Sequence, residues 1–120
     1  MLHWSSCLFA TVVLHAYHIQ CVGYHHVFLM LTVSSLLFHC LHHPVVRVVD
    51  KFLAHLAYVM VVFDTPKALA ADALWLLVFP VMSACAWFGQ SFWPERKDPL
   101  HLGVHLIGVC GMHAYLEVLY

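Results

Sequence analysis

Histidines are the residues of this chain whose type and spacing could do chemistry. There are twelve of them, and imidazole is both a common metal ligand and a group that titrates near neutral pH. His101 and His105 are four residues apart, as are Ser35 and His39, so each pair shares one face of a helix. Asp50 follows His39 by eleven residues. Three imidazoles, a carboxylate and a hydroxyl could together bind a metal ion and activate water.

The donor types favour zinc. A catalytic zinc site uses three protein ligands and keeps a fourth position for water, whose pKa the metal lowers toward about 7. We expect Asp50 to hold that water or accept its proton as general base, and Ser35 to hydrogen-bond the water or the substrate carbonyl. A structural ion pair with Arg47 or Lys51 is the alternative for Asp50. The predicted Zn²⁺ ligands are His39, His101 and His105.

These polar side chains lie in a chain that is otherwise apolar. Of its 120 residues, 63% are hydrophobic and 9% are charged, whereas soluble domains carry about 25% charged residues. A soluble fold of this size could not bury so much apolar surface. The composition therefore predicts an all-α integral membrane bundle, and ionisable groups inside such a bundle indicate function because they are costly there.

Five apolar stretches can be drawn, each near the roughly 20 residues that span about 30 Å of hydrocarbon. Polar or helix-breaking segments such as "HHP", "DTPK" and "GQSFWPERKDP" separate most of them, and short connections make neighbouring helices antiparallel. We expect about five transmembrane helices in a single domain over residues 1–120. The stretches are 2–19, 23–42, 47–64, 68–89 and 99–119.

Lysine and arginine predict the orientation. With five spans, Lys67 lies on the side opposite the N-terminus, and the other four basic residues lie on the side of the N-terminus. The positive-inside rule then places the N-terminus on the cytoplasmic side, or the matrix or stromal side of an organelle. The second span ends at that side and the third and fifth begin there. The candidate zinc ligands, Ser35 and Asp50 therefore fall at one membrane depth.

This pattern resembles the CREST superfamily of membrane hydrolases and receptors, which includes alkaline ceramidases, progestin and adipoQ receptors and myomaker-like proteins. Its members have S-x-x-x-H late in an early helix, Asp near the start of the next, and H-x-x-x-H on the last helix. Here "SLLFH" (residues 35–39), Asp50 and "HLGVH" (residues 101–105) stand in those places. The resemblance implies zinc on the three histidines, Asp50 and Ser35 around the zinc water, and cleavage of lipid amides such as ceramide.

The chain departs from the family pattern in two ways. Family members usually have seven membrane helices, so relative to the family pattern two are missing between Asp50 and the last pair. Because an even number is missing, the last helix keeps its direction and its histidines stay on the side of His39. Val104 stands where the ceramidases look to have a tryptophan beside the final histidine.

The other histidines leave alternatives open. His55 lies about 140° around its helix from Asp50, so we expect it to point elsewhere and to be a hydrogen-bonded bundle residue. A further group is expected near the opposite membrane surface, as interfacial residues, as a second metal site, or as ligands of one haem between His113 and His15, His18 or His25. That group comprises His15, His18, His25, His26 and His113.

The leading hypothesis is a zinc-dependent intramembrane hydrolase of a lipid amide or ester, with zinc-bound water as nucleophile and a membrane lipid as partner. The alternatives are a non-catalytic small subunit or assembly factor of a larger membrane complex, and a haem-binding membrane protein. Glycines on the last stretch fit close packing in the bundle or in a homo-oligomer. A net charge of −1 argues against a nucleic-acid partner, since phosphate binding needs clustered basic residues.

Overall fold

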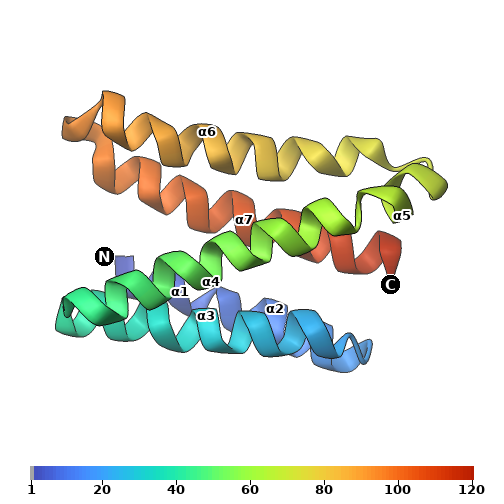
Figure 1. The fold of residues 1–120 in the computed structure, drawn as a ribbon, viewed down its shortest axis with the longest axis horizontal. Coiled ribbons are helices and arrows are strands. Elements are labelled where there is room, and N and C mark those ends of the chain that lie inside the picture. The colour runs from blue at the N-terminus through green and yellow to red at the C-terminus, as the bar shows by residue number, and fades with distance from the viewer. Residues whose placement is uncertain (1) are drawn as a thin grey trace.

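A computed structural model describes residues 2–120, with the side chains of residues 4–120. All regular structure in this part of the chain is helical, which confirms the all-α prediction. The helices run along the long axis of a body measuring 40 × 29 × 20 Å (Figure 1). They are α1 (Leu2–Cys7), α2 (Phe9–His18), α3 (Val22–Leu41), α4 (Pro44–Phe63), α5 (Thr65–Ala70), the 3₁₀ turn η1 (Leu74–Leu77), α6 (Val78–Phe92), the 3₁₀ turn η2 (Pro94–Arg96) and α7 (Lys97–Leu119).

Three helical stretches of the described chain are long and apolar enough to cross a membrane. They are α3, Leu74–Phe92 and Pro94–Leu119. Helix α4 is as long as α3 but carries Arg47, Asp50 and Lys51 in its first two turns. Large apolar side chains face outward, among them Leu14, Phe52, Val62, Phe63, Phe88 and Phe92. A surface of this kind marks a contact with lipid or another apolar partner, so the structure indicates membrane association.

The first apolar stretch is not one helix. The sequence predicts a continuous helix over 2–19, but the structure has two short helices separated at Leu8. The Leu8 amide donates to the Ser5 carbonyl at 3.1 Å, and the Thr11 hydroxyl donates to the Leu8 carbonyl at 2.6 Å. Bonds of these two kinds tighten and bend helices. Ser5 and Ser6, beside the break, are fully buried.

The fourth apolar stretch also contains a break. The sequence predicts one helix over 68–89, but α5 ends just before Asp72, which has a left-handed φ of 53°. The Ala73 amide donates to the Ala68 carbonyl at 2.8 Å, the closure of a Schellman motif. Asp adopts the left-handed conformation more readily than most residues, so the chain turns here and α6 begins only after η1.

The connection between α3 and α4 follows from its sequence. His42 closes α3 with a φ of 52°, and His43 is extended with a ψ of 133°, as a residue before proline prefers to be. Pro44 then occupies the first turn of α4, where its missing amide proton has no cost. The α3–α4 and α6–α7 connections and the N-terminus lie at the same end of the molecule (Figure 1, left).

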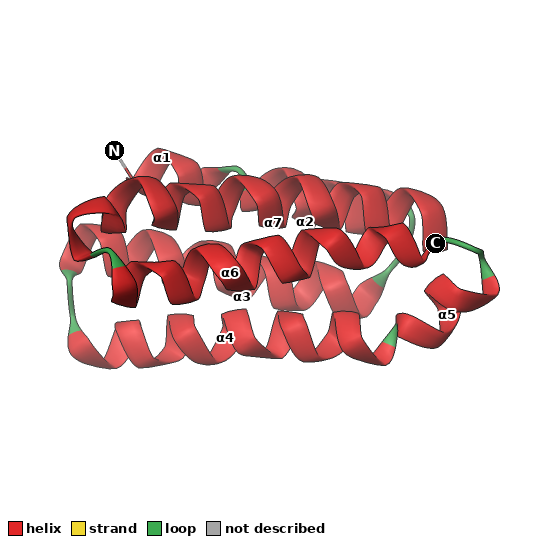
Figure 2. Cartoon of the chain, turned by 90° about the horizontal axis from the view of Figure 1, so that it is seen from above, coloured by secondary structure: helices red, strands yellow, loops and turns green. Residues whose placement is uncertain are grey.

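Packing between the helices is uneven. Helix α3 packs against α1, α2 and α4, helix α6 packs against α7, and α1 and α2 also contact α7. In Figure 2, α4 runs along the lower edge of the molecule and α6 runs above it, and the two helices hardly touch each other. Two adjoining cavities lie in the space between α4 and the α6–α7 pair.

Gly111 sets the distance between α6 and α7. A Cβ atom on Gly111 would lie 2.5 Å from the Cβ of Phe79, which cannot rotate away, so a Gly111→Ala change should push the helices apart. Overpacking of this kind costs about 1–3 kcal/mol, and we expect a lower thermal unfolding midpoint in detergent. The control is Gly103→Ala, because nothing lies within 4 Å of its added Cβ. Equal midpoints for the two variants would contradict this role.

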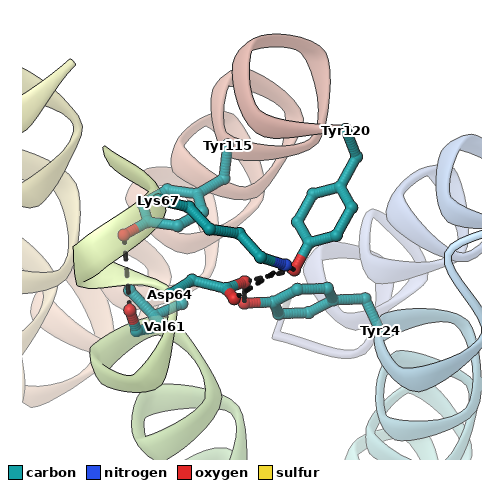
Figure 3. A network of polar contacts seen from close by, with 6 residues as sticks. All are labelled: Tyr24, Val61, Asp64, Lys67, Tyr115 and Tyr120. Atoms are coloured by element: carbon teal, nitrogen blue, oxygen red, sulfur yellow. Dashed lines mark hydrogen bonds and ion pairs between the residues drawn. The ribbon is translucent and has the colours of Figure 1, made fainter. Parts of the chain in front are cut away.

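Asp64 ties three helices together at the opposite end of the bundle (Figure 3). The hydroxyls of Tyr24 and Tyr120 donate to its Oδ2 at 2.5 and 2.6 Å, and Lys67 Nζ lies 3.3 Å from its Oδ1. Burial raises the pKa of the Asp64 carboxyl, but the hydrogen bonds from Tyr120, Tyr24 and Lys67 outweigh it and hold that pKa below its ordinary value. The carboxylate therefore stays ionised at neutral pH and joins α3, the α4–α5 turn and the end of α7.

Candidate metal centre

Three histidines from two helices meet near the end of the molecule that holds the N-terminus. His39 lies in the last turn of α3, and His101 and His105 lie in the first half of α7. One ring nitrogen from each lies within 4.8 Å of the others. The ring centroids are 4.7 Å apart for the pair on α7, and 5.5 and 5.9 Å apart between His39 and that pair. These are the three residues that the sequence analysis predicts as zinc ligands. Metal binding itself stays a prediction.

Helix α1 lies against both helices of the cluster. It packs against both α3 and α7, and each of its two consecutive serines bonds to one of these helices. Ser5 Oγ lies 2.8 Å from Nδ1 of His105, and Ser6 Oγ lies 2.8 Å from Ser35 Oγ on α3. Helix α1 therefore forms hydrogen bonds to His105 on α7 and to Ser35 on α3.

The surroundings of the α7 histidines fit metal ligation. The Ser5 hydroxyl can accept a hydrogen bond from Nδ1–H of His105, which leaves the Nε2 lone pair for a metal. Ligand histidines usually have such a partner on the other ring nitrogen. Nε2 of His101 is buried and has no hydrogen-bond partner among the described side chains. Buried polar atoms almost always have a partner, so a nitrogen of this kind beside two other imidazoles fits a cation. Three neutral imidazoles are a donor set that suits Zn²⁺.

A cavity of about 190 Å³ lies beside the cluster. An engineered cavity of roughly 150 Å³ accommodates benzene, so this one has room for the reacting group of a substrate. Its wall includes two of the three candidate ligands, both predicted catalytic residues and several aromatic rings. Residues of this wall include Ser35, Asp50, His55, Tyr58, Trp87, His101 and His105.

Asp50 contributes a carboxylate to the cavity wall. Its Oδ1 accepts a hydrogen bond from Ser34 Oγ at 3.1 Å. Among the side chains the structure describes, Asp50 forms no ion pair with Arg47 or Lys51, and the Arg47 guanidinium lies over the Phe38 ring, 6.0 Å from its centroid. The arrangement agrees with a carboxylate available to the cavity rather than with a structural ion pair.

The two remaining residues of the sequence analysis also line this cavity. Ser35 does so while its hydroxyl bonds to Ser6, so its contact with a substrate or a water stays a prediction. His55 was expected to point elsewhere, yet it lies on the same wall, where its Nδ1 donates to the Lys51 carbonyl at 2.6 Å. The cavity reaches from α4 to α6, so residues about 140° apart around α4 can both line it. The angle between two residues on a helix does not show how wide the neighbouring cavity is.

Sequence reasoning missed the serines that support the site, namely Ser5, Ser6 and Ser34. A signal was present, because the chain has two Ser-Ser pairs, in "WSSC" and "VSSL", within stretches that are otherwise apolar. Four small hydroxyls in apolar helices need buried partners. The structure gives those partners as His105, Asp50 and each other.

Ser5 should control the metal affinity of the cluster. Loss of a hydrogen-bond partner behind a ligand histidine typically weakens metal binding about 10–100-fold, and we expect this from Ser5→Ala. Zinc competition against a chromophoric chelator measures the affinity. Ser6→Ala is the matched control, since it removes an equally buried hydroxyl that bonds to Ser35 instead. If both variants bind zinc like the wild type, Ser5 does not orient a ligand.

A second group of histidines lies toward the other end of the bundle. His15 on α2 and His113 on α7 bond directly, with their Nδ1 atoms 2.8 Å apart, and Glu117 lies 3.5 Å from Nε2 of His15. His25 and His26 donate to backbone carbonyls. Among the described residues only the cluster of His39, His101 and His105 brings three ligand groups together. The direct His15–His113 contact accounts for that pair without a metal, and the haem alternative stays a prediction for visible absorption to test.

No protein-family model, curated protein or solved structure matches the chain. The resemblance to the CREST superfamily therefore rests on "SLLFH", Asp50 and "HLGVH". It bears on function only as a proposal.

Proposed function

We propose that the protein is a zinc-dependent intramembrane hydrolase of a lipid amide or ester, similar in its chemistry to the alkaline ceramidases. The observation that carries the proposal is the set of three imidazole nitrogens within 4.8 Å of one another, beside a cavity that also contains the Asp50 carboxylate. Zinc held by His39, His101 and His105 would polarise a substrate carbonyl and lower the pKa of water toward about 7.

Asp50 is the proposed general base. Its carboxylate would accept a proton from the water as the water oxygen bonds to the carbonyl carbon, and would return that proton to the leaving nitrogen or oxygen as the amide or ester bond breaks. The products are a carboxylic acid and an amine or alcohol. Ser34 holds one carboxylate oxygen by its hydrogen bond, which leaves the other for the water.

The surroundings of the site favour a lipid as the substrate. A second, apolar cavity of about 90 Å³ adjoins the first, and its wall includes Phe28, Val61, Phe79 and Met112. Both cavities lie between α4 and the α6–α7 pair, and α4 and α6 hardly touch. An acyl chain is the kind of group that an apolar space of this type accepts.

The proposal includes a multi-pass topology with the metal site near the cytoplasmic, matrix or stromal surface. The basic residues support this placement, because Arg47, Lys51, Arg96 and Lys97 are near the α3–α4 and α6–α7 connections. Those two connections share one end of the molecule with the N-terminus (Figure 1), and an excess of basic residues is typical of the cytoplasmic side.

Removal of the metal tests the proposal. Purified protein is assayed in detergent against fluorescent ceramides, N-acyl amides and acyl esters, before and after treatment with a chelator. We expect at least one of these lipids to be hydrolysed, the activity to disappear with the metal, and added Zn²⁺ to restore it. Hydrolysis that is indifferent to the chelator would refute the proposal. So would co-purification with a fixed set of partners and no metal, which would favour the non-catalytic subunit.

A further inference from the structure

Tyr58 reaches from α4 to α6 across the space where these helices hardly pack. Its hydroxyl donates to Ser83 Oγ at 2.5 Å, and Ser83 Oγ donates to the Val104 carbonyl of α7 at 3.4 Å. Ser83 is 2% exposed. Among the described side chains, the Tyr58–Ser83 contact is the one hydrogen bond between α4 and α6. These bonds form a polar bridge from α4 through α6 to α7 in an otherwise apolar region.

The bridge lies at the boundary between the two cavities. The polar chamber, which contains Asp50 and the α7 histidines, and the apolar chamber, which extends toward Val61 and Phe79, have a common wall. Tyr58 and Val104, the two ends of the bridge, both belong to it. The residues of that common wall are Phe9, Leu31, Ala54, Tyr58 and Val104.

The volumes of the two chambers limit the length of acyl chain that each can hold. The polar chamber of about 190 Å³ is only somewhat larger than a cavity of roughly 150 Å³ that accommodates benzene. It can hold a reacting carbonyl with a short chain, but not a long acyl chain as well. The apolar chamber of about 90 Å³ lies on the other side of Tyr58, so a chain whose carbonyl is at the histidines and whose tail enters this chamber passes Tyr58.

We propose that Tyr58 is a gate between the two chambers and determines the acyl-chain length that the site accepts. With its hydrogen bond to Ser83 formed, the chambers are separate and short chains fit. With that bond broken and the ring displaced, the chambers join and a long chain can extend through them. A single hydrogen bond between two neutral hydroxyls is weak enough for an entering chain to displace. The identity of the ligand as an acyl lipid rests on the proposed function.

Two substitutions remove the Tyr58–Ser83 hydrogen bond and leave an aromatic ring at position 58. Tyr58→Phe keeps the ring and removes the donor, and Ser83→Ala removes the acceptor from the other helix. Tyr24→Phe is the matched control, because it also removes a buried 2.5 Å hydrogen bond of a tyrosine hydroxyl, here from α3 to Asp64 in the α4–α5 turn. Tyr24 lines neither cavity. Thermal unfolding midpoints confirm that each variant is folded.

The first readout needs no catalysis. Palmitate with a diazirine at its methyl end is photolysed with protein that carries Asp50→Asn, and the labelled peptides are identified by mass spectrometry. We expect Tyr58→Phe and Ser83→Ala each to increase labelling of the apolar chamber, at Phe79 and Met112, by about tenfold or more, since a change of pocket fit by one methylene already gives about 10–200-fold. Tyr24→Phe should label like its parent.

The second readout is the ratio of kcat/KM for palmitoyl over octanoyl substrate, which should rise in the same two variants and not in Tyr24→Phe. The two readouts distinguish the two proposals. Increased labelling in a protein that hydrolyses no lipid would support the gate and overturn the proposed hydrolase. Normal turnover with unchanged labelling and an unchanged ratio in Tyr58→Phe and Ser83→Ala would overturn the gate and leave the hydrolase in place.

Discussion

Replacing His101 and His105 together with alanine should remove zinc from the protein. Wild-type protein purified in detergent should contain about one zinc ion per chain, and the double variant close to none, by elemental analysis. The reason is coordination number: a zinc site of this type has three protein ligands, and the variant would leave only His39. A single imidazole in an apolar bundle cannot compensate for the dehydration of a divalent cation.

The other histidine pair provides the control for this experiment. His15→Ala with His113→Ala also removes two imidazoles that contact each other, one of them again on α7. That variant should keep its zinc, although it can be less stable because the α2–α7 hydrogen bond is lost. Equal zinc content in both double variants would show that the cluster at His39 is not the metal site.

Asp50→Asn should abolish most of the hydrolytic activity and leave the metal bound. Asparagine has nearly the shape of aspartate and can still accept the hydrogen bond from Ser34, but its amide cannot take a proton from water. Loss of a general base typically costs about 10²–10⁴-fold in rate, and we expect a fall in kcat of this size with zinc content unchanged. Turnover and elemental analysis of the same preparation measure both quantities.

A distant aspartate gives the matched control. Asp72 lies in the turn before η1 with a left-handed φ of 53°, which asparagine adopts readily, so Asp72→Asn should leave both rate and zinc content unchanged. Wild-type turnover in Asp50→Asn would remove Asp50 from the reaction. Loss of zinc in Asp50→Asn would instead make it a residue on which metal binding depends.

The sequence was most informative about features that depend on the helical period and on the alternating direction of successive helices. His101 and His105 share a helix face because four residues make about one turn. His39 meets them because α3 ends, and α7 begins, at the same end of the bundle. The bundle class followed from composition in the same way. Neither inference needed knowledge of how the helices pack.

The parts that were missed depend on packing. The break at Leu8 and the place of α1 between α3 and α7 decide which way Ser5 and Ser6 face, and no local pattern encodes a contact between residues 5 and 105. The turn at Asp72 divides the stretch 68–89, which the sequence predicts as one continuous apolar helix. Tyr58 and Ser83 are neutral, so neither charge nor ligand spacing distinguished them from ordinary bundle residues.

The candidate centre joins helices that are far apart in the sequence, since Ser5 of α1 bonds to His105 and His39 of α3 lies beside the two imidazoles of α7. The site is complete only when α1, α3 and α7 have packed together, so the cation would bind only after these three helices have assembled. A ligand that binds the finished form alone, at a hundred times its dissociation constant, adds about 2.7 kcal/mol of stability. Zinc would then stabilise the packing of α1 and α3 against α7, three helices that are far apart in the sequence.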